Sequence, residues 1–249
     1  MSYARKQVIP FYEGRIGSWQ IKIDRLSLDV SELSKRFDRL AKAWHAMLRR
    51  LGYHAAYEDL WERLLGLSSL PLSRSHSPNI LDCGAGTGSF SAAFARAWAS
   101  PVKVSGVDAS PGMLSEAETL YAQQGIKADL RCADTRSLPY LDNEFDLVMT
   151  AHVLEHLVNP KVALREMKRV LKPGGWLVVG VTRDSLLGRY IHFKWRTHLF
   201  KPAQLAKWID SEGLNVLDED IPLRGLFGKT SLVCVCQKPL TAEQIDHDK

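Results

Sequence analysis

The sequence predicts an α/β fold built on a mostly parallel, seven-stranded sheet with helices on both faces. Between residues 79 and 182, short apolar runs alternate with helix-like segments. The connections are short, and prolines stand at segment boundaries, where a missing N–H is tolerated: Pro101, Pro111, Pro160 and Pro173. Because parallel strands need a crossover between them, this alternation is typical of a sheet covered by helices on both sides.

The apolar runs and the helical periodicity define the expected elements in order. Strands are expected at 79–83, 102–107, 127–132, 145–150, 175–182, 214–221 and 229–237. Helices are expected at 88–99, 111–124, 160–172 and 203–212. In such sheets a ligand lies over the carboxyl ends of the strands, so functional residues are expected there.

Residues 1–77 precede this pattern and are expected to form a helical extension. One helix is expected at 31–51, with Ser31 as its N-cap, and a second is expected to end at Gly66. Apolar side chains recur through the first helix at helical spacing: Leu33, Phe37, Leu40, Ala41, Trp44, Leu48 and Leu51. The serine-rich stretch at 70–78 is interpreted as a linker. Residues 78–240 then form the main domain, and 241–249 a polar tail.

Composition restricts the class of protein only loosely. The formal net charge of +5 permits an anionic partner without requiring one. The four cysteines lack metal-site spacing, so reduced, buried thiols are expected, as is typical of a cytosolic protein. The first residues lack the apolar core of a signal peptide, and no apolar run approaches the ~18 residues of a membrane span. A cytoplasmic location is therefore expected.

A glycine-rich turn follows the first strand of the alternating pattern. Gly84, Gly86 and Gly88 come directly after the apolar run, and Asp108 ends the next run 20 residues later. This layout is typical of a nucleoside-binding βαβ unit, in which the acid accepts hydrogen bonds from ribose hydroxyls. Two alternatives remain at this point, because any tight turn favours glycine and Asp108 could cap the following helix.

The residues around the turn favour one nucleoside over another. Ser89 stands where the dinucleotide pattern needs its third glycine, and Asp82 places a carboxylate beside the turn. A carboxylate repels a pyrophosphate but attracts a ligand that carries an ammonium and a sulfonium, which favours S-adenosylmethionine over NAD. The run Leu81-Asp82-x-Gly84-x-Gly86-x-Gly88 resembles the first motif of the class I S-adenosylmethionine-dependent methyltransferases.

The resemblance continues in order along the chain, at 107–110, 132–135, 145–157 and 169–179. It implies a Rossmann-like sheet that ends in an antiparallel strand pair. It also implies a set of cofactor-binding residues: Asp82, Gly84, Ala85, Gly86, Gly88, Asp108, Ala109, Met113, Ala133, Asp134, Thr135 and Thr150. Two of these have a simpler alternative, since Asp134 could cap a turn and Met113 could belong to the core.

Two histidines lie within the motif at 145–157. His152 and His156 frame the pattern H-x-x-E-H, which zinc peptidases also use, with both histidines on one helical face. The third ligand is missing and the family that the chain resembles commonly carries a His-x-x-x-His here, so no metal is expected. His152 is a candidate general base, and His156 is expected to make a structural hydrogen bond. The residues leave open whether either histidine transfers a proton.

The methyl acceptor is the least determined part of the function. The resemblance implies in-line methyl transfer and is closest to small-molecule and lipid methyltransferases, including those of quinone biosynthesis. Thr150-Ala151-His152 differs from the Asn/Asp-Pro-Pro-aromatic motif of amino-group DNA methyltransferases, so nucleic acid is not the expected acceptor. An RNA or protein acceptor remains an alternative. A nucleoside-binding partner subunit without turnover is another.

Two basic segments have both a structural and a functional interpretation. Residues 183–201 are either a solvated lid or an acceptor cap, whose candidate contacts are Tyr190, His192, Trp195 and Arg196. The 31–51 helix, with a charge of +4, either faces the core or contacts an anionic membrane surface. The sequence leaves the oligomeric state open.

Overall fold

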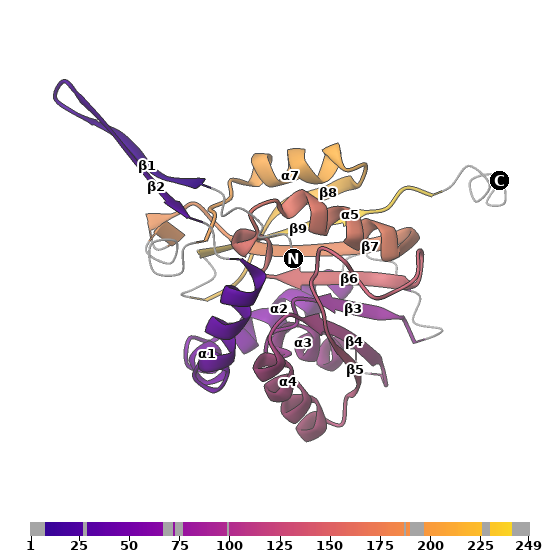
Figure 1. Cartoon of the computed structure of the whole chain (residues 1–249). Coiled ribbons are helices and arrows are strands. Elements are labelled where there is room, and N and C mark those ends of the chain that lie inside the picture. Colours follow the sequence, from indigo (N-terminus) through magenta and orange to yellow (C-terminus); the bar gives the residue numbers. More distant parts are fainter. Residues whose placement is uncertain are drawn as a thin grey trace.

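The central sheet of the computed structural model contains seven strands in the order β5-β4-β3-β6-β7-β9-β8 (Figure 1). The structure describes residues 8–26, 29–66, 72, 77–98, 100–186, 188–189, 197–225 and 230–240. The strands are β3 (Ile80–Cys83), β4 (Lys103–Asp108), β5 (Lys127–Cys132), β6 (Phe145–Ala151), β7 (Leu171–Thr182), β8 (Asn215–Pro222) and β9 (Ser231–Gln237). β3 to β7 pair in parallel, and β9 runs antiparallel to β7 and β8. The predicted fold class is confirmed.

Helices cover both faces of this sheet because its strands are apolar on both sides. Neighbouring residues of a strand point to opposite faces. Ile80 thus joins an apolar cluster with α2 (Tyr53–Gly66), α3 (Ser89–Trp98) and α4 (Pro111–Gln124), whereas Leu81 joins a second cluster with α5 (Pro160–Val170) and α7 (Pro202–Ser211). Figure 1 shows these two helical layers on either side of the strands.

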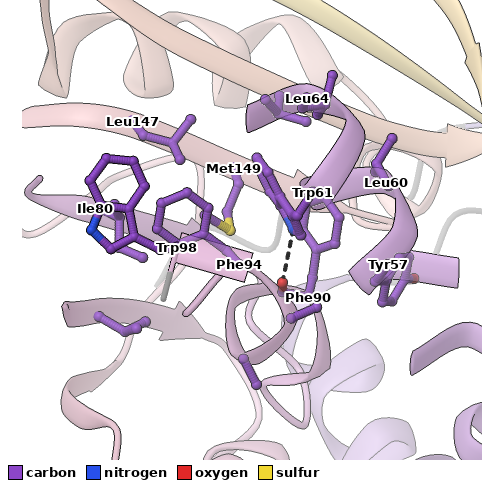
Figure 2. Packing of buried hydrophobic residues seen from close by; sticks show 14 of the residues in the cluster. Tyr57, Leu60, Trp61, Leu64, Ile80, Phe90, Phe94, Trp98, Leu147 and Met149 are labelled. Atoms are coloured by element: carbon purple, nitrogen blue, oxygen red, sulfur yellow. Dashed lines mark hydrogen bonds between the residues drawn. The ribbon is translucent and has the colours of Figure 1, made fainter. Parts of the chain in front are cut away.

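The first cluster fixes the N-terminal helices to the main domain. Trp61 of α2 is fully buried, and its indole Nε1–H donates to the carbonyl oxygen of Phe90 at 3.1 Å (Figure 2). Its ring lies against Phe90 and Phe94. The apolar contact area of these rings and the satisfied indole donor together hold α2 against α3.

The N-terminal extension is helical over α1 (Val30–Arg50) and α2, as expected, but a hairpin that the sequence analysis missed precedes them. Its strands are β1 (Val8–Ile16) and β2 (Trp19–Leu26), joined by a turn at Gly17, and Figure 1 shows the hairpin extending away from the sheet. The expected N-cap at Ser31 is also wrong. Asp29 caps α1, because it and Glu32 form a reciprocal capping box.

Two further expectations need correction. Cys132 is exposed, whereas the other three cysteines are buried, because it lies on the edge strand β5; all four thiols are free. The helix expected at 160–172 ends at Val170, since Leu171 is already extended and pairs with Phe145. The predicted tail 241–249, most of the predicted linker 70–78 and residues 190–196 of the predicted lid lie outside the described residues.

α1 crosses the start of α4 and is attached to it by side-chain hydrogen bonds. The Asp38 carboxylate accepts from Ser110 Oγ at 2.6 Å and from the Gly112 backbone N–H at 2.8 Å. Ser34 Oγ donates to the carbonyl oxygen of Ala109 at 2.8 Å. A carboxylate at a helix N-terminus is also favoured by the helix dipole, so Asp38 holds α1 in one position over α4.

We expect Gly112→Ala to destabilise the protein, although alanine normally stabilises a helix by about 1 kcal/mol over glycine. A Cβ at residue 112 would lie 3.0 Å from Asp38 Oδ1 and 3.2 Å from Asp38 Cα. The free energy of unfolding in urea should fall by about 1–2 kcal/mol, as for other overpacked contacts. Gln123→Ala, at an exposed site of the same helix, is the control and should change stability little. A more stable Gly112→Ala variant would show that α1 does not rest there.

Candidate active site

A cavity lies at the carboxyl ends of β3, β4 and β6, and α1 forms its roof. The space between its atoms is about 990 Å³, part of which is open to solvent. The floor comes from the loops after these strands, whose ends meet because the strands pair in parallel register, with Cys83 opposite Val107. The roof side chains are mainly apolar: Val30, Leu33, Ser34, Phe37, Trp44 and Leu48.

The glycine turn after β3 has room only for backbone. Gly84 and Gly88 have φ angles of 75° and 78°, which side-chain-bearing residues rarely adopt. A Cβ at Gly84 would lie 2.2 Å from Val153 Cγ2, and one at Gly88 would lie 2.8 Å from the Tyr121 ring. The Gly84 N–H donates to Val107 O at 2.7 Å, which ties the turn to β4. The turn therefore presents bare backbone to the cavity.

Asp82 is a buried carboxylate beside this turn. Asp82 is 1% exposed, and its Oδ2 accepts a hydrogen bond from Ser91 Oγ at 2.6 Å. Burial, reinforced by the nearby Asp108 carboxylate, raises the pKa of Asp82 to about 7. Within the described part of the chain no cation pairs with it. A cationic ligand group in the cavity would therefore favour its ionised form.

Asp108 holds the turn and the next helix start at the same time. Its Oδ2 accepts from the Gly86 N–H and its Oδ1 from the Ser110 N–H, both at 2.9 Å. Burial raises the pKa of this carboxyl, although the backbone donors partly oppose the effect. Each carboxylate oxygen can accept a further hydrogen bond, so the structural contacts leave capacity for two ligand hydroxyls.

Eleven of the sequence-predicted residues line the cavity: Asp82, Gly84, Ala85, Gly86, Asp108, Ala109, Met113, Asp134, Thr135, His152 and His156. Asp134 also forms a two-point ion pair with Arg136; burial opposes ionisation, but these contacts outweigh it and lower the pKa of Asp134. Three predicted residues are not brought to the cavity. Gly88 packs on Tyr121, Ala133 packs on the core, and the buried Thr150 donates to Cys83 O at 2.8 Å, joining β6 to β3.

The two histidines do not share a helical face, unlike the histidines of the zinc-peptidase pattern H-x-x-E-H. His152 has a φ of 58°, and Leu154–His156 is a single 3₁₀ turn. The Nδ1 of His152 lies 3.0 Å from Oε1 of the buried Glu155, and its Nε2 lies 3.2 Å from Ser231 Oγ. A positive φ at a non-glycine residue is costly, so these contacts hold the imidazole at the cavity wall against backbone strain.

His156 is in a different electrostatic environment. Its ring meets the Phe37 ring of α1 edge to face, with centroids 5.3 Å apart. Burial lowers the pKa of His156 to about 4, despite the opposing charge of Glu155, so this imidazole is neutral near pH 7. Within the described ranges, no group of three His, Cys, Asp or Glu side chains could hold a metal ion.

The predicted acceptor contacts Tyr190, His192, Trp195 and Arg196 lie outside the described residues. The sequence predicted that residues 1–77 form a cap on the acceptor side of the cleft, but it did not identify the individual α1 residues of the cavity roof. The signal was present, because Leu33, Phe37, Trp44 and Leu48 form an apolar stripe, but such a stripe usually faces a core. Other missed residues come from the elements beside the turn: Tyr57, Thr87, Ser89, Phe90, Ser110, Ala151, Val153 and Leu157.

The fold and this site are those of a Rossmann-like nucleoside-binding enzyme, and comparison with known proteins agrees. Residues 81–179 match the family model of the methyltransferase domain. An uncharacterised protein of Methanocaldococcus jannaschii is 39% identical over 157 residues, which cover 60% of this chain and 70% of that protein. The demethylmenaquinone methyltransferase of Clavibacter sepedonicus is 33% identical over 154 residues, covering 62% of this chain and 59% of that protein.

Among known structures, the magnesium protoporphyrin IX methyltransferase of Synechocystis with bound S-adenosylmethionine superposes with a TM-score of 0.65 at 17% identity. The match covers 85% of this chain and 98% of that one. The chain belongs to the class I S-adenosylmethionine-dependent methyltransferases. It spans 41–60% of the length of the named methyltransferases that it matches in sequence. No helix in the described parts of the chain is both long and apolar enough to cross a membrane.

The methyl donor of this family is S-adenosylmethionine, and the cavity fits it. The ligand carries an ammonium, a sulfonium and two ribose hydroxyls. The cavity offers a side-chain-free turn, the buried Asp82 without a cation partner among the described residues, and Asp108 with acceptor capacity to spare. The ammonium and the ribose hydroxyls would therefore each meet a complementary carboxylate.

We expect the affinity for S-adenosylhomocysteine to rise roughly five- to tenfold between about pH 6 and pH 7.5 as Asp82 ionises. The ligand ammonium stays largely protonated over this range, so the carboxylate determines the change. Titration calorimetry measures it. Without ligand, folding stability should fall as the pH rises from about 4 to about 7 and level off above that, because the folded state holds a proton that the unfolded chain has released.

Asp82→Asn is the matched control for this experiment, because it removes the titrating group at nearly constant size. Its affinity should be lower than that of the wild-type protein at pH 7.5 and nearly independent of pH. An undiminished pH dependence in Asp82→Asn would assign the effect to another group.

Proposed function

We propose that this protein transfers a methyl group from S-adenosylmethionine to an apolar small-molecule or lipid acceptor that loses a proton in the reaction. The observation that carries the proposal is the division of one cavity into two chemically different halves. Its floor holds buried carboxylates beside bare backbone, and its roof is lined by Val30, Leu33 and the aromatic rings of Phe37 and Trp44.

The floor supports the cofactor half of the proposal. Asp82 would bind the methionine ammonium, Asp108 the ribose hydroxyls, and Asp134 with Thr135 the adenine edge, while the turn at 84–86 lies along the ligand. When bound, S-adenosylmethionine supplies an electrophilic methyl carbon, which the acceptor attacks in line as S-adenosylhomocysteine is released. The protein mainly contributes orientation, which can lower the barrier by roughly 7–11 kcal/mol.

The roof supports the choice of acceptor. An apolar, partly aromatic wall offers few of the cationic or N–H donors that the phosphates of a nucleic-acid backbone need. It suits a ring or an aliphatic chain that gains by leaving water. The relative from Clavibacter sepedonicus is named a demethylmenaquinone methyltransferase, which is consistent with an acceptor of this kind.

Between the two histidines, the contacts favour His152 as the base. His156, with a pKa lowered to about 4, is too weakly basic to take a proton efficiently near neutral pH. His152 has the Glu155 carboxylate at Nδ1, and this negative charge would stabilise an imidazolium. With Nδ1 donating to Glu155, the Nε2 of the neutral ring accepts from Ser231 Oγ, and the acceptor proton would pass to this nitrogen.

We expect His152→Ala to lower kcat by about 10²–10⁴, the usual contribution of a positioned base. Glu155→Gln should lower it less, because the imidazole remains while its counter-charge is lost. Affinity for S-adenosylhomocysteine and the melting temperature check that both variants fold. His156→Gln is the comparison and should act mainly on KM through the roof contact with Phe37. An unchanged kcat in His152→Ala would eliminate the base assignment.

The acceptor class can be tested directly. The protein is incubated with a cell extract and methyl-labelled S-adenosylmethionine, and the extract is separated into lipid, RNA, protein and small solutes. We expect label in the lipid or small-solute fraction, and demethylmenaquinone is the first pure acceptor to assay. Label in RNA or protein would contradict the proposal. Cofactor binding without label in any fraction would favour a non-catalytic partner subunit.

A further inference from the structure

We propose that the outward face of α1 is a docking surface for an anionic lipid bilayer. This cationic face consists of Lys35, Arg39, Lys42, Arg49 and Arg50, all of which are exposed. The inference deepens the proposed function, because it names the place from which an apolar acceptor reaches the cavity. The docking step itself requires neither cofactor nor acceptor.

The five cations gather on one side of the helix. At 3.6 residues per turn they fall within an arc of about 100°. Leu33, Phe37, Trp44 and Leu48 lie about 180° away from the middle of this arc, and these side chains line the cavity. One helix thus separates the cavity from the cationic face.

The charges of this face are not neutralised by the protein. Within the described residues, no carboxylate forms an ion pair with any of the five cations. The one exposed acid of α1, Asp38, is used in binding Ser110 and Gly112 at the start of α4. Elsewhere on the surface arginines are paired with acids, as shown by the pairs Arg63–Asp59, Arg131–Asp129, Arg165–Glu212, Arg169–Glu166 and Arg183–Asp220.

The chemistry around the cations favours a bilayer over a nucleic acid. Besides Asp38, the exposed residues between them are Ala43 and Ala46, and the face offers no aromatic ring on which a base could stack. The α1 roof of the cavity is lined mainly by apolar side chains, so an acceptor that packs against it would itself dissolve in lipid. A headgroup surface needs only charge from the protein, and each Lys or Arg near an anionic leaflet strengthens binding about fivefold.

The test is co-sedimentation of the full chain with vesicles of phosphatidylcholine and phosphatidylserine, without cofactor or acceptor. The test variant carries Lys35→Gln, Arg39→Gln and Lys42→Gln. The control variant carries Lys103→Gln, Lys127→Gln and Lys207→Gln, at exposed sites away from α1. Both variants lower the formal net charge from +5 to +2, so they differ only in where charge is removed.

We expect the α1 variant to bind these vesicles on the order of a hundredfold more weakly, and the control variant to bind nearly as the wild-type protein does. Binding should fall steeply with salt and be absent with phosphatidylcholine alone. Equal losses in both variants, or no vesicle binding by the wild-type protein at low salt, would overturn the proposal. If the wild-type protein bound single-stranded RNA more tightly than vesicles, and the α1 variant lost this binding, the proposal would also be overturned in favour of a nucleic acid.

This outcome is separable from that of the proposed function. The α1 variant keeps the cavity-lining side chains, so its affinity for S-adenosylhomocysteine and its melting temperature should be unchanged. Methyl transfer with no vesicle binding would leave the proposed function and remove the docking surface. Vesicle binding with no methyl transfer would do the reverse.

Discussion

The constraint on which the site depends is the burial of two carboxylates on either side of a backbone turn. Asp82 and Asp108 both have raised pKa values, because burial disfavours their charge; the Asp108 carboxylate adds to the effect at Asp82, and the Asp38 carboxylate adds to it at Asp108. Such a pair is stable only where donors or cations compensate it. Backbone N–H groups of the turn and of the next helix compensate Asp108, whereas Asp82 has one hydroxyl from Ser91. Of the two carboxylates, Asp82 is therefore the less compensated, and because it lines the cavity, a cation bound there would stabilise its charge.

The site also depends on the position of α1, a helix that has one face toward the cavity and the other toward solvent. The apolar side chains of α1 line the cavity rather than pack into a core. Only Ala41 of this helix is therefore buried. Polar anchors at Ser34 and Asp38 therefore supply what packing does not. They attach the helix to residues 109–112, immediately after Asp108. The α1 roof of the cavity and Asp108 are consequently held by the same short stretch of backbone.

The sequence predicted the sheet, its strand boundaries within a few residues and most of the cavity floor, because glycine spacing and apolar runs are local signals. It could not predict features set by long-range contacts. The positive φ of His152 depends on Glu155, Thr182 and Ser231, which come from three segments. Thr150 is a related case, since its motif position predicted a ligand contact, whereas its hydroxyl bridges two strands in a contact that the motif does not reveal. The apolar stripe of α1 was visible, but periodicity does not distinguish a core from a cavity.

Charge balance connects the two halves of the cavity in the proposed reaction. A bound ammonium would compensate Asp82 on the floor, so the carboxylate would not be left exposed to the acceptor. On the wall, Glu155 accepts three hydrogen bonds at Oε1, from His152, Thr182 N and Thr182 Oγ1. Burial alone would raise the pKa of Glu155, but these contacts and the nearby histidines outweigh it and lower the pKa. A carboxylate that stays ionised there favours a positive charge on the imidazole beside it. The proton released by the acceptor would then move toward a site that already carries its counter-charge, and no unpaired charge would form in the apolar part of the cavity.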